Sequence, residues 1–206
     1  MMRKSLMLLA GSAVVAAVCW QQAAQAAFFG YPRGLHVPFE HIQFDAPTLG
    51  PMAHARFCVQ YPDECKPQRI VFRGGGVVLT RQRWADLVAV NAKVNRSIAP
   101  ERNYAGIVGE RWIISPKSGD CNDYAVTKRH ELRTRGWPSR GLLLAEVETS
   151  SGEHHLVLVV HTRAGDFVAD NLNANIRSWT APKYKWVRVQ SPLNPKFWST
   201  VANSAA

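Results

Sequence analysis

The sequence predicts an α+β fold in which helices come first along the chain and an antiparallel sheet follows. Apolar residues recur at three- and four-residue steps over residues 80–98, which is typical of a helix. From residue 142 onward, short apolar runs rich in Val are separated by turns that contain Gly, which is typical of strands. A chain of 206 residues that is 47% hydrophobic and 19% charged is long enough for one domain with its own core.

The first 26 residues have the layout of a secretory signal peptide. Arg3 and Lys4 give a positive start, and residues 6–20 form an apolar run that is shorter than the roughly twenty residues a membrane helix needs. Residues 24–26 (AQA) place small side chains where signal peptidase cuts. We therefore expect cleavage after residue 26, export to the periplasm and a single domain over residues 27–206, with a retained membrane anchor as the alternative.

The charge of the chain resembles that of a nucleic-acid-binding protein, with 25 Lys+Arg against 15 Asp+Glu and a formal net charge of +10. Two of the positive charges, Arg3 and Lys4, leave with the signal peptide, so that 10 − 2 gives +8 for the mature chain. The remaining basic residues are scattered and do not form a stripe with interleaved aromatic residues. We expect no nucleic-acid partner.

The mature chain begins with residues 27–57, which are rich in Pro, Gly, Phe and His and show no sustained period, so we expect an irregular lead-in. Residues 73–76 (RGGG) form a flexible joint that lacks the Lys-Ser/Thr of a phosphate loop. A helix follows, capped by Thr80 and ended before Pro100. Trp84 and the other apolar residues of its stripe are expected in the core.

A second helix is expected from about Asp120 to Arg135, where residues 136–138 (GWP) stop it. Asp120 is a good N-cap, and Asp123 stands three residues later, as in an acidic form of the capping box. We expect the basic residues of this helix to form its solvated side: Lys128, Arg129, Arg133 and Arg135.

Four strands are expected over residues 142–148, 155–161, 167–170 and about 186–189. Turn signals at residues 151–152 and 164–165 separate the first three strands as an antiparallel meander. Asp166 is expected in the second turn. Trp112 and Trp137 flank the second helix and are expected to be buried, although either can wall a cleft.

The cysteines leave one thiol that needs a function. Cys19 lies in the signal peptide, so the mature chain keeps Cys58, Cys65 and Cys121. In an oxidising compartment this odd number means one disulfide and one free thiol, or three free thiols. Cys58 and Cys65 flank a polar turn and can close a small loop, which would stabilise the fold by about 2–3 kcal/mol. A zinc pair is less favoured because no second Cys/His pair stands at finger spacing.

Cys121 opens the second helix, where unpaired backbone N–H groups and the positive end of the helix dipole favour a thiolate. The same N–H groups can hold an oxyanion. A thiolate nucleophile also needs an imidazole to carry the proton and an acid to orient it. His155 begins one strand and Asp170 ends the next, so the two can face each other across the pair. This pattern alone is weak, because many chains of this length offer such residues.

Several motifs in a fixed order make the pattern specific. They are residues 119–125 (GDCNDYA), Gly136, residues 152–160 (GEHHLVLVV), Gly165, residues 170–172 (DNL) and Trp179, preceded by the segment from Phe57 to Cys65. In these motifs the sequence resembles the bacterial transglutaminase-like cysteine proteinases, which include the LapG-type periplasmic proteases, over about residues 55–200. The resemblance implies a papain-like/transglutaminase-like core, with the nucleophile at the N-terminus of a helix packed on an antiparallel sheet. It also implies Cys121 as nucleophile, His155 as general base and acid, and Asp170 as orienting acid.

The resemblance also implies a calcium site and a type of substrate. LapG-type proteases are similar in binding calcium through one acid before the cysteine and two after it. Asp120 and Asp123 match this pattern, but Asn122 replaces one acid, which removes a charge and weakens the expected site. The implied partners are a protein substrate, which in the LapG-type members is a large surface adhesin important for biofilms, and a membrane-bound regulatory receptor.

Two alternatives keep the same fold. An amine instead of water would take the acyl group in a transglutaminase-like amide or acyl transferase, and a non-catalytic periplasmic binding module would use the fold only for recognition. A metal cluster of His154, His155 and His161 is not expected, because His154 lies on the opposite face of the strand and His161 lies about 20 Å from His155 along it.

Overall fold

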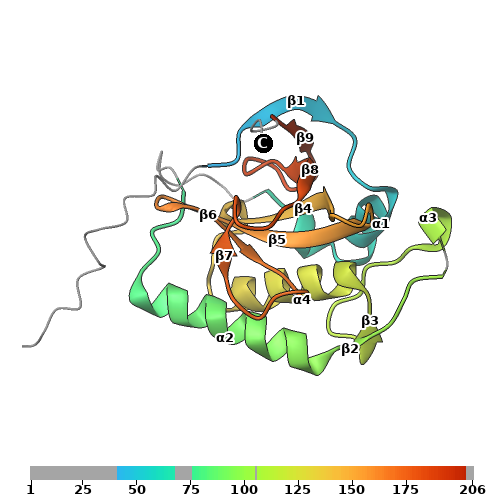
Figure 1. The fold of residues 1–206 in the computed structure, drawn as a ribbon, viewed down its shortest axis with the longest axis horizontal. Helices are drawn as coiled ribbons and strands as arrows, with labels where there is room; N and C mark the ends of the chain where they lie inside the picture. Colours follow the sequence, from blue (N-terminus) through green and yellow to red (C-terminus); the bar gives the residue numbers. More distant parts are fainter. Residues whose placement is uncertain (1–40, 68–75, 105, 203–206) are drawn as a thin grey trace, which may run out of the picture. The chain divides into compact units, whose positions relative to one another are not determined.

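The computed structural model of the chain describes residues 41–67, 76–104 and 106–202. The expected signal peptide at residues 1–26 lies outside these residues. The described part contains a seven-stranded antiparallel sheet, in which β1 (Phe44–Thr48), β9 (Trp198–Val201), β8 (Lys185–Gln190), β4 (Leu142–Glu148), β5 (His154–Thr162), β6 (Gly165–Ala169) and β7 (Arg177–Ser178) follow in this order (Figure 1). It also contains a two-stranded parallel pair of β2 (Ala99–Pro100) and β3 (Ser118–Gly119). The predicted α+β class is confirmed. No helix among the described residues is long and apolar enough to cross a lipid bilayer.

The helices are α1 (Met52–Gln60), η1 (Pro62–Cys65), α2 (Arg81–Ser97), α3 (Gly106–Gly109), α4 (Cys121–Thr134) and η2 (Ser139–Gly141).

The predicted meander of β4, β5 and β6 is present. Each of the four expected strands begins and ends within two residues of the predicted positions. The expected irregular lead-in at residues 27–57 is wrong where the structure describes it, because β1 and most of α1 lie there. β1 is an edge strand that contains Pro47 and pairs with β9 through a register shift. Such a strand lacks the regular alternation that reveals a strand in a sequence.

Helix α2 begins as predicted, since the Thr80 hydroxyl accepts a hydrogen bond from the Arg83 backbone N–H at 3.2 Å. The prediction that Trp84 belongs to the core is wrong, because its side chain is 36% exposed. Only one stripe of α2 packs against α4, and its buried residues are Leu87, Val90, Asn91 and Val94. The Trp84 ring lies beside this stripe and meets Phe167 edge-on.

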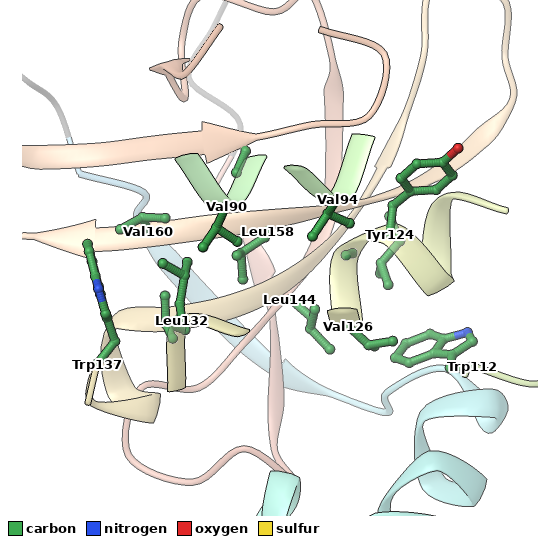
Figure 2. Packing of buried hydrophobic residues seen from close by; sticks show 14 of the residues in the cluster. Val90, Val94, Trp112, Tyr124, Val126, Leu132, Trp137, Leu144, Leu158 and Val160 are labelled. Carbon is green, nitrogen blue, oxygen red and sulfur yellow. The ribbon is translucent and has the colours of Figure 1, made fainter. Parts of the chain in front are cut away.

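Helix α4 packs against α2 and against β5 (Figure 1). Two of the four basic residues that were predicted on its solvated side are therefore buried. Lys128 and Arg129 are each only 1% exposed. Arg129 forms an ion pair with buried Glu64 at 2.5 Å and donates to the Leu142 carbonyl at 3.0 Å. Figure 2 shows side chains from α2, α4, β4 and β5 that meet in the core, among them Val90, Val94, Leu132, Leu144 and Leu158.

The two faces of the central sheet carry different clusters. Leu142, Leu144, Leu158 and Val160 belong to the cluster that includes α2 and α4. Leu143, Ala145, Val157 and Val159 belong to a second cluster, together with Trp179, Trp186 and Val189. Because side chains alternate along a strand, His155, His161, Asp166 and Asp170 share the parity of this second cluster. The strand pair β5–β6 therefore presents polar residues at both of its ends on one face.

Candidate active site

Cys121 occupies the first position of α4, and the turn before it is fixed by hydrogen bonds. The Asp120 carboxylate accepts from the Asn122 N–H at 2.9 Å, and the Asp123 carboxylate accepts from the Asp120 N–H at 3.2 Å. This is the predicted capping box. A Cβ atom on Gly119 would lie 2.1 Å from the Asp123 carboxylate, so the box needs glycine at this position.

His155 and Asp170 meet across β5 and the end of β6. In this pair Leu158 lies opposite Ala169, which brings the next residue, Asp170, toward the start of β5. His155 Nε2 is 2.9 Å from Asp170 Oδ1, and the two residues are 6% and 2% exposed. The expected facing of the two side chains is therefore what the structure shows.

Three further groups hold Asp170. The Tyr184 hydroxyl donates to Oδ2 at 2.5 Å, the Leu172 backbone N–H donates to Oδ1 at 2.9 Å, and Asn95 Nδ2 donates to the Asp170 backbone carbonyl at 2.9 Å. Burial acts to raise the pKa of Asp170, but the hydrogen bonds and charge of His155 and the bond from Tyr184 outweigh it, so this pKa lies below its usual value. An ionised Asp170 keeps the proton on Nε2 of His155 and leaves Nδ1 free to accept another.

Cys121 and His155 line the same space. A cavity of about 330 Å³ has both residues in its wall, with Met52, Trp112 and Leu156 on its apolar side. A more open cavity of about 820 Å³ also has both residues in its wall, together with Tyr104 and Leu172. The two residues therefore belong to the wall that the two cavities share.

The thiol of Cys121 is more strongly protonated than the sequence predicts. Burial raises its pKa to about 12, and the carboxylates of Asp120 and Glu110 add to this effect. The backbone N–H groups of Leu156 and Asn122 act in the opposite direction but do not outweigh burial. The prediction of a favoured thiolate was based on the position of Cys121 at the helix N-terminus. The sequence does not reveal the burial of the thiol or the nearby charge of Glu110, which both raise its pKa.

Asp120, Asp123 and Glu110 lie close enough to act on one another electrostatically, and Glu110 was not predicted. Burial and the charges of Asp120 and Glu110 raise the pKa of Asp123 to about 6, and burial raises that of Glu110. Asn122 Nδ2 donates to Glu110 Oε1 at 2.5 Å, and the Ile113 N–H donates to Asp123 Oδ1 at 2.7 Å. Glu110 lies in an irregular segment between α3 and β3, where the sequence offers no spacing signal.

The other candidate residues have different surroundings, although Trp112 Nε1 donates a hydrogen bond to Glu110 Oε1 at 3.2 Å. Cys58 and Cys65 form a disulfide with a Cα–Cα distance of 5.5 Å, and Cys121 is the free cysteine of the described residues. His154 is exposed and hydrogen-bonds Glu146 at 2.8 Å. Trp112 and Trp137 are both 2% exposed, as expected, and Trp112 also walls the smaller cavity.

Comparisons with known proteins give one family and one group of structures. The model of the bacterial transglutaminase-like cysteine proteinases (BTLCP) matches residues 45–206. No curated protein matches the chain. A structure of LapG from Legionella pneumophila is 23% identical with a TM-score of 0.48, covering 56% of this chain and 68% of LapG. Calcium-bound LapG is 23% identical with a TM-score of 0.48, and the match covers 59% of this chain and 72% of LapG. EGTA-treated LapG is 22% identical with a TM-score of 0.49, and the match covers 60% of this chain and 69% of LapG.

Proposed function

Because the chain belongs to the bacterial transglutaminase-like cysteine proteinase family and is a cysteine peptidase of the transglutaminase-like superfamily, we propose that it is an exported endopeptidase. It hydrolyses a peptide bond of a periplasmic or cell-surface protein through Cys121, His155 and Asp170. The observation that carries the proposal is the hydrogen bond between His155 Nε2 and Asp170 Oδ1 beside cavities whose wall includes Cys121.

The first half-reaction forms an acyl-enzyme. His155 Nδ1 takes the proton of the Cys121 thiol as the sulfur attacks the scissile carbonyl carbon. The resulting oxyanion lies at the start of α4, where the backbone N–H of Cys121 has no acceptor within the helix. The C–N bond then breaks, and the imidazolium gives its proton to the leaving amine.

The second half-reaction releases the other product. His155 removes a proton from water, whose oxygen attacks the thioester carbonyl, and the thiolate leaves and takes back the proton. Asp170 stays ionised and stabilises the imidazolium through Nε2, as its lowered pKa requires. The raised pKa of Cys121 means that the proton moves during attack rather than before it.

The family and the cavities beside Cys121 support a protein substrate. An extended polypeptide that passes Cys121 would contact both cavities, since Cys121 and His155 line each of them. A large surface adhesin as substrate, a membrane-bound receptor as regulator, a role in biofilms and a periplasmic location come from the resemblance to the LapG-type proteases. The sequence of residues 1–26 supports the location.

We also propose that Asp120, Asn122 and Asp123 bind a calcium ion. The residues offer the oxygen donors that a hard divalent cation prefers, and burial together with the charges of Asp120 and Glu110 raises the pKa of Asp123 to about 6. Glu110 supplies the third carboxylate, which offsets the charge missing at Asn122. Bound calcium would neutralise these carboxylates and fix the start of α4. Calorimetry of calcium binding to the wild-type and Asp120→Asn chains tests this, and equal binding would contradict it.

The decisive experiment compares cell-surface and secreted proteins from cells that carry the wild-type chain or Cys121→Ala. We expect one large protein to stay at the surface only with Cys121→Ala. Incubation of that protein with the purified chain then separates the reaction classes by mass: hydrolysis adds one water for each bond cut, whereas acyl transfer to an amine eliminates ammonia. Unchanged surface proteins together with unchanged masses would overturn the proposal in favour of a binding module.

A further inference from the structure

A second histidine–aspartate group lies at the other end of the β5–β6 pair. His161 is paired directly with Asp166 across the two strands, and its Nδ1 lies 2.8 Å from Asp166 Oδ1. His41, which precedes β1, places its own Nδ1 3.3 Å from the same oxygen. The proposed mechanism uses none of these three residues.

The three side chains have the donor set and spacing of a transition-metal site. All three ligand atoms lie within 4.8 Å of one another. Tetrahedral zinc with bonds of about 2.0–2.1 Å places its ligand atoms about 3.3 Å apart. The two distances from Asp166 Oδ1, 2.8 and 3.3 Å, lie near this spacing, so small side-chain movements would admit the ion.

Asp166 is held in place for this role. It is 1% exposed, its Oδ2 accepts from the Ile42 backbone N–H at 2.9 Å, and its carbonyl accepts from the Trp179 N–H at 3.0 Å. Partners of this kind orient ligands in metal sites. The prediction that Asp166 lies in the turn is wrong, because Asp166 is a residue of β6 and pairs with His161 of β5.

The histidines leave one side open to solvent. Their side chains are 40% (His41) and 21% (His161) exposed, and the rings meet at an angle of 61° with centroids 5.4 Å apart. An ion can reach the ligand atoms from this side and take water as a fourth ligand.

We propose that His41, His161 and Asp166 bind one zinc ion, which fastens the segment before β1 to the β5–β6 hairpin. This site is separate from Cys121 and from the acidic residues beside it. The ion would join residues 125 positions apart in the chain, so its binding should stabilise the fold.

The test uses the Cys121→Ala chain, because the thiol of the candidate active site could bind zinc itself. No reductant is added, since opening the disulfide would free Cys58 and Cys65 beside His54, another group of possible ligands. Zinc chloride is titrated into chelator-treated protein by calorimetry. We expect one zinc per chain and a higher melting temperature with zinc.

Variants then identify the ligands. We expect His41→Ala and His161→Gln each to weaken zinc binding by at least about tenfold, and the glutamine keeps an N–H that can still donate to Asp166. His130→Ala is the matched control, because His130 is also 40% exposed and hydrogen-bonds a buried carboxylate, Glu64, at 2.8 Å. Circular dichroism checks that each variant is folded.

If the chain does not bind one equivalent of zinc, the three side chains form only a hydrogen-bonded cluster, and the proposal is overturned. Binding that persists in both His41→Ala and His161→Gln would also overturn it, as would an equal loss in His130→Ala. Loss in the first two variants with binding intact in the control would support it.

Discussion

His155 and His161 lie on the same face of β5, six residues apart, and each hydrogen-bonds a buried aspartate from the β6 segment. At one end, Asp170 also accepts from Tyr184, and its partner His155 lines the same cavities as the proposed nucleophile. At the other end, Asp166 is shared with His41. One strand pair thus supplies two imidazole–carboxylate pairs, and the neighbours of each pair determine its chemistry.

Tyr184→Phe should lower kcat/KM about tenfold, because it removes a hydrogen bond to a charged group, Asp170. Without that bond the pKa of Asp170 rises, so the acidic limb of the pH–rate profile should move to higher pH. The profile is measured with the identified substrate.

Tyr61→Phe is the control for this prediction. The Tyr61 hydroxyl accepts a hydrogen bond from Gln60 at 3.1 Å and is not bonded to Asp170. If both variants lose the same activity and keep the same pH profile, Tyr184 has only a structural role.

Cys121 should react with iodoacetamide as a half-buried thiol with a raised pKa. Because its pKa is raised to about 12, we expect the alkylation rate to rise about tenfold for each pH unit from about pH 6 to 10, without a plateau. Glu110→Gln and Asp120→Asn each remove a charge that raises this pKa, so each variant should react faster at a given pH.

Asp63→Asn removes an exposed carboxylate on η1 that pairs with Lys66, and it should leave the rate unchanged. The site of alkylation is identified by mass spectrometry of peptides. A plateau that begins at acidic pH would mean that Cys121 and His155 form a thiolate–imidazolium pair in the free enzyme.

The local part of the site could be predicted from the sequence. Asp120, Cys121 and Asp123 lie within one helical turn, so capping rules place them, and His155 and Asp170 lie on adjacent strands, so side-chain alternation places them. The assignment of roles needed the family motifs, because a cysteine, a histidine and an aspartate on such elements are common.

The residues that the sequence did not reveal come from irregular segments. Tyr184 precedes β8, Glu110 follows α3 and His41 precedes β1, and none of these segments has a period that fixes where a side chain points. Lys128 and Arg129 were predicted incorrectly for a different reason. A charged residue usually marks the solvated side of a helix, but α4 is covered on two sides, and only the tertiary structure shows this.

Glu64→Gln should destabilise the fold by about 3–5 kcal/mol, because it leaves a buried arginine without its counterion. Glu64 forms ion pairs with Arg129 at 2.5 Å, His130 at 2.8 Å and Arg133 at 2.7 Å. Burial acts to raise the pKa of Glu64, but these partners lower it, so its stabilising effect is present above the usual value of 4.5 and is lost as the pH falls through the lowered pKa.

Urea unfolding at several pH values measures this effect. Glu131→Gln is the control, because Glu131 pairs with Lys93, whose side chain is 60% exposed, and this change should cost less than about 1 kcal/mol. Equal losses in the two variants would mean that the buried network contributes no more than a surface pair.

Lys128→Met should stabilise the fold at neutral pH by at least about 1 kcal/mol. Lys128 is 1% exposed, and among the described residues its Nζ has no hydrogen-bond partner, although it lies 5.9 Å from the centre of the Tyr124 ring. Burial lowers the pKa of Lys128 from 10.5 to about 7, while the charge of Asp170 acts to raise it.

The sign of the pH dependence follows from this shift. Between about pH 7 and 10.5 the unfolded chain holds the Lys128 proton more tightly than the folded chain, so the free energy of unfolding of the wild type rises with pH in this window. Lys128→Met lacks this contribution, and its advantage should be greatest below pH 7 and shrink toward pH 10.5. Lys93→Met, on the exposed side of α2, should show no such trend. An advantage of Lys128→Met that is constant from pH 6 to 10 would show that the amine keeps its ordinary pKa in the folded protein.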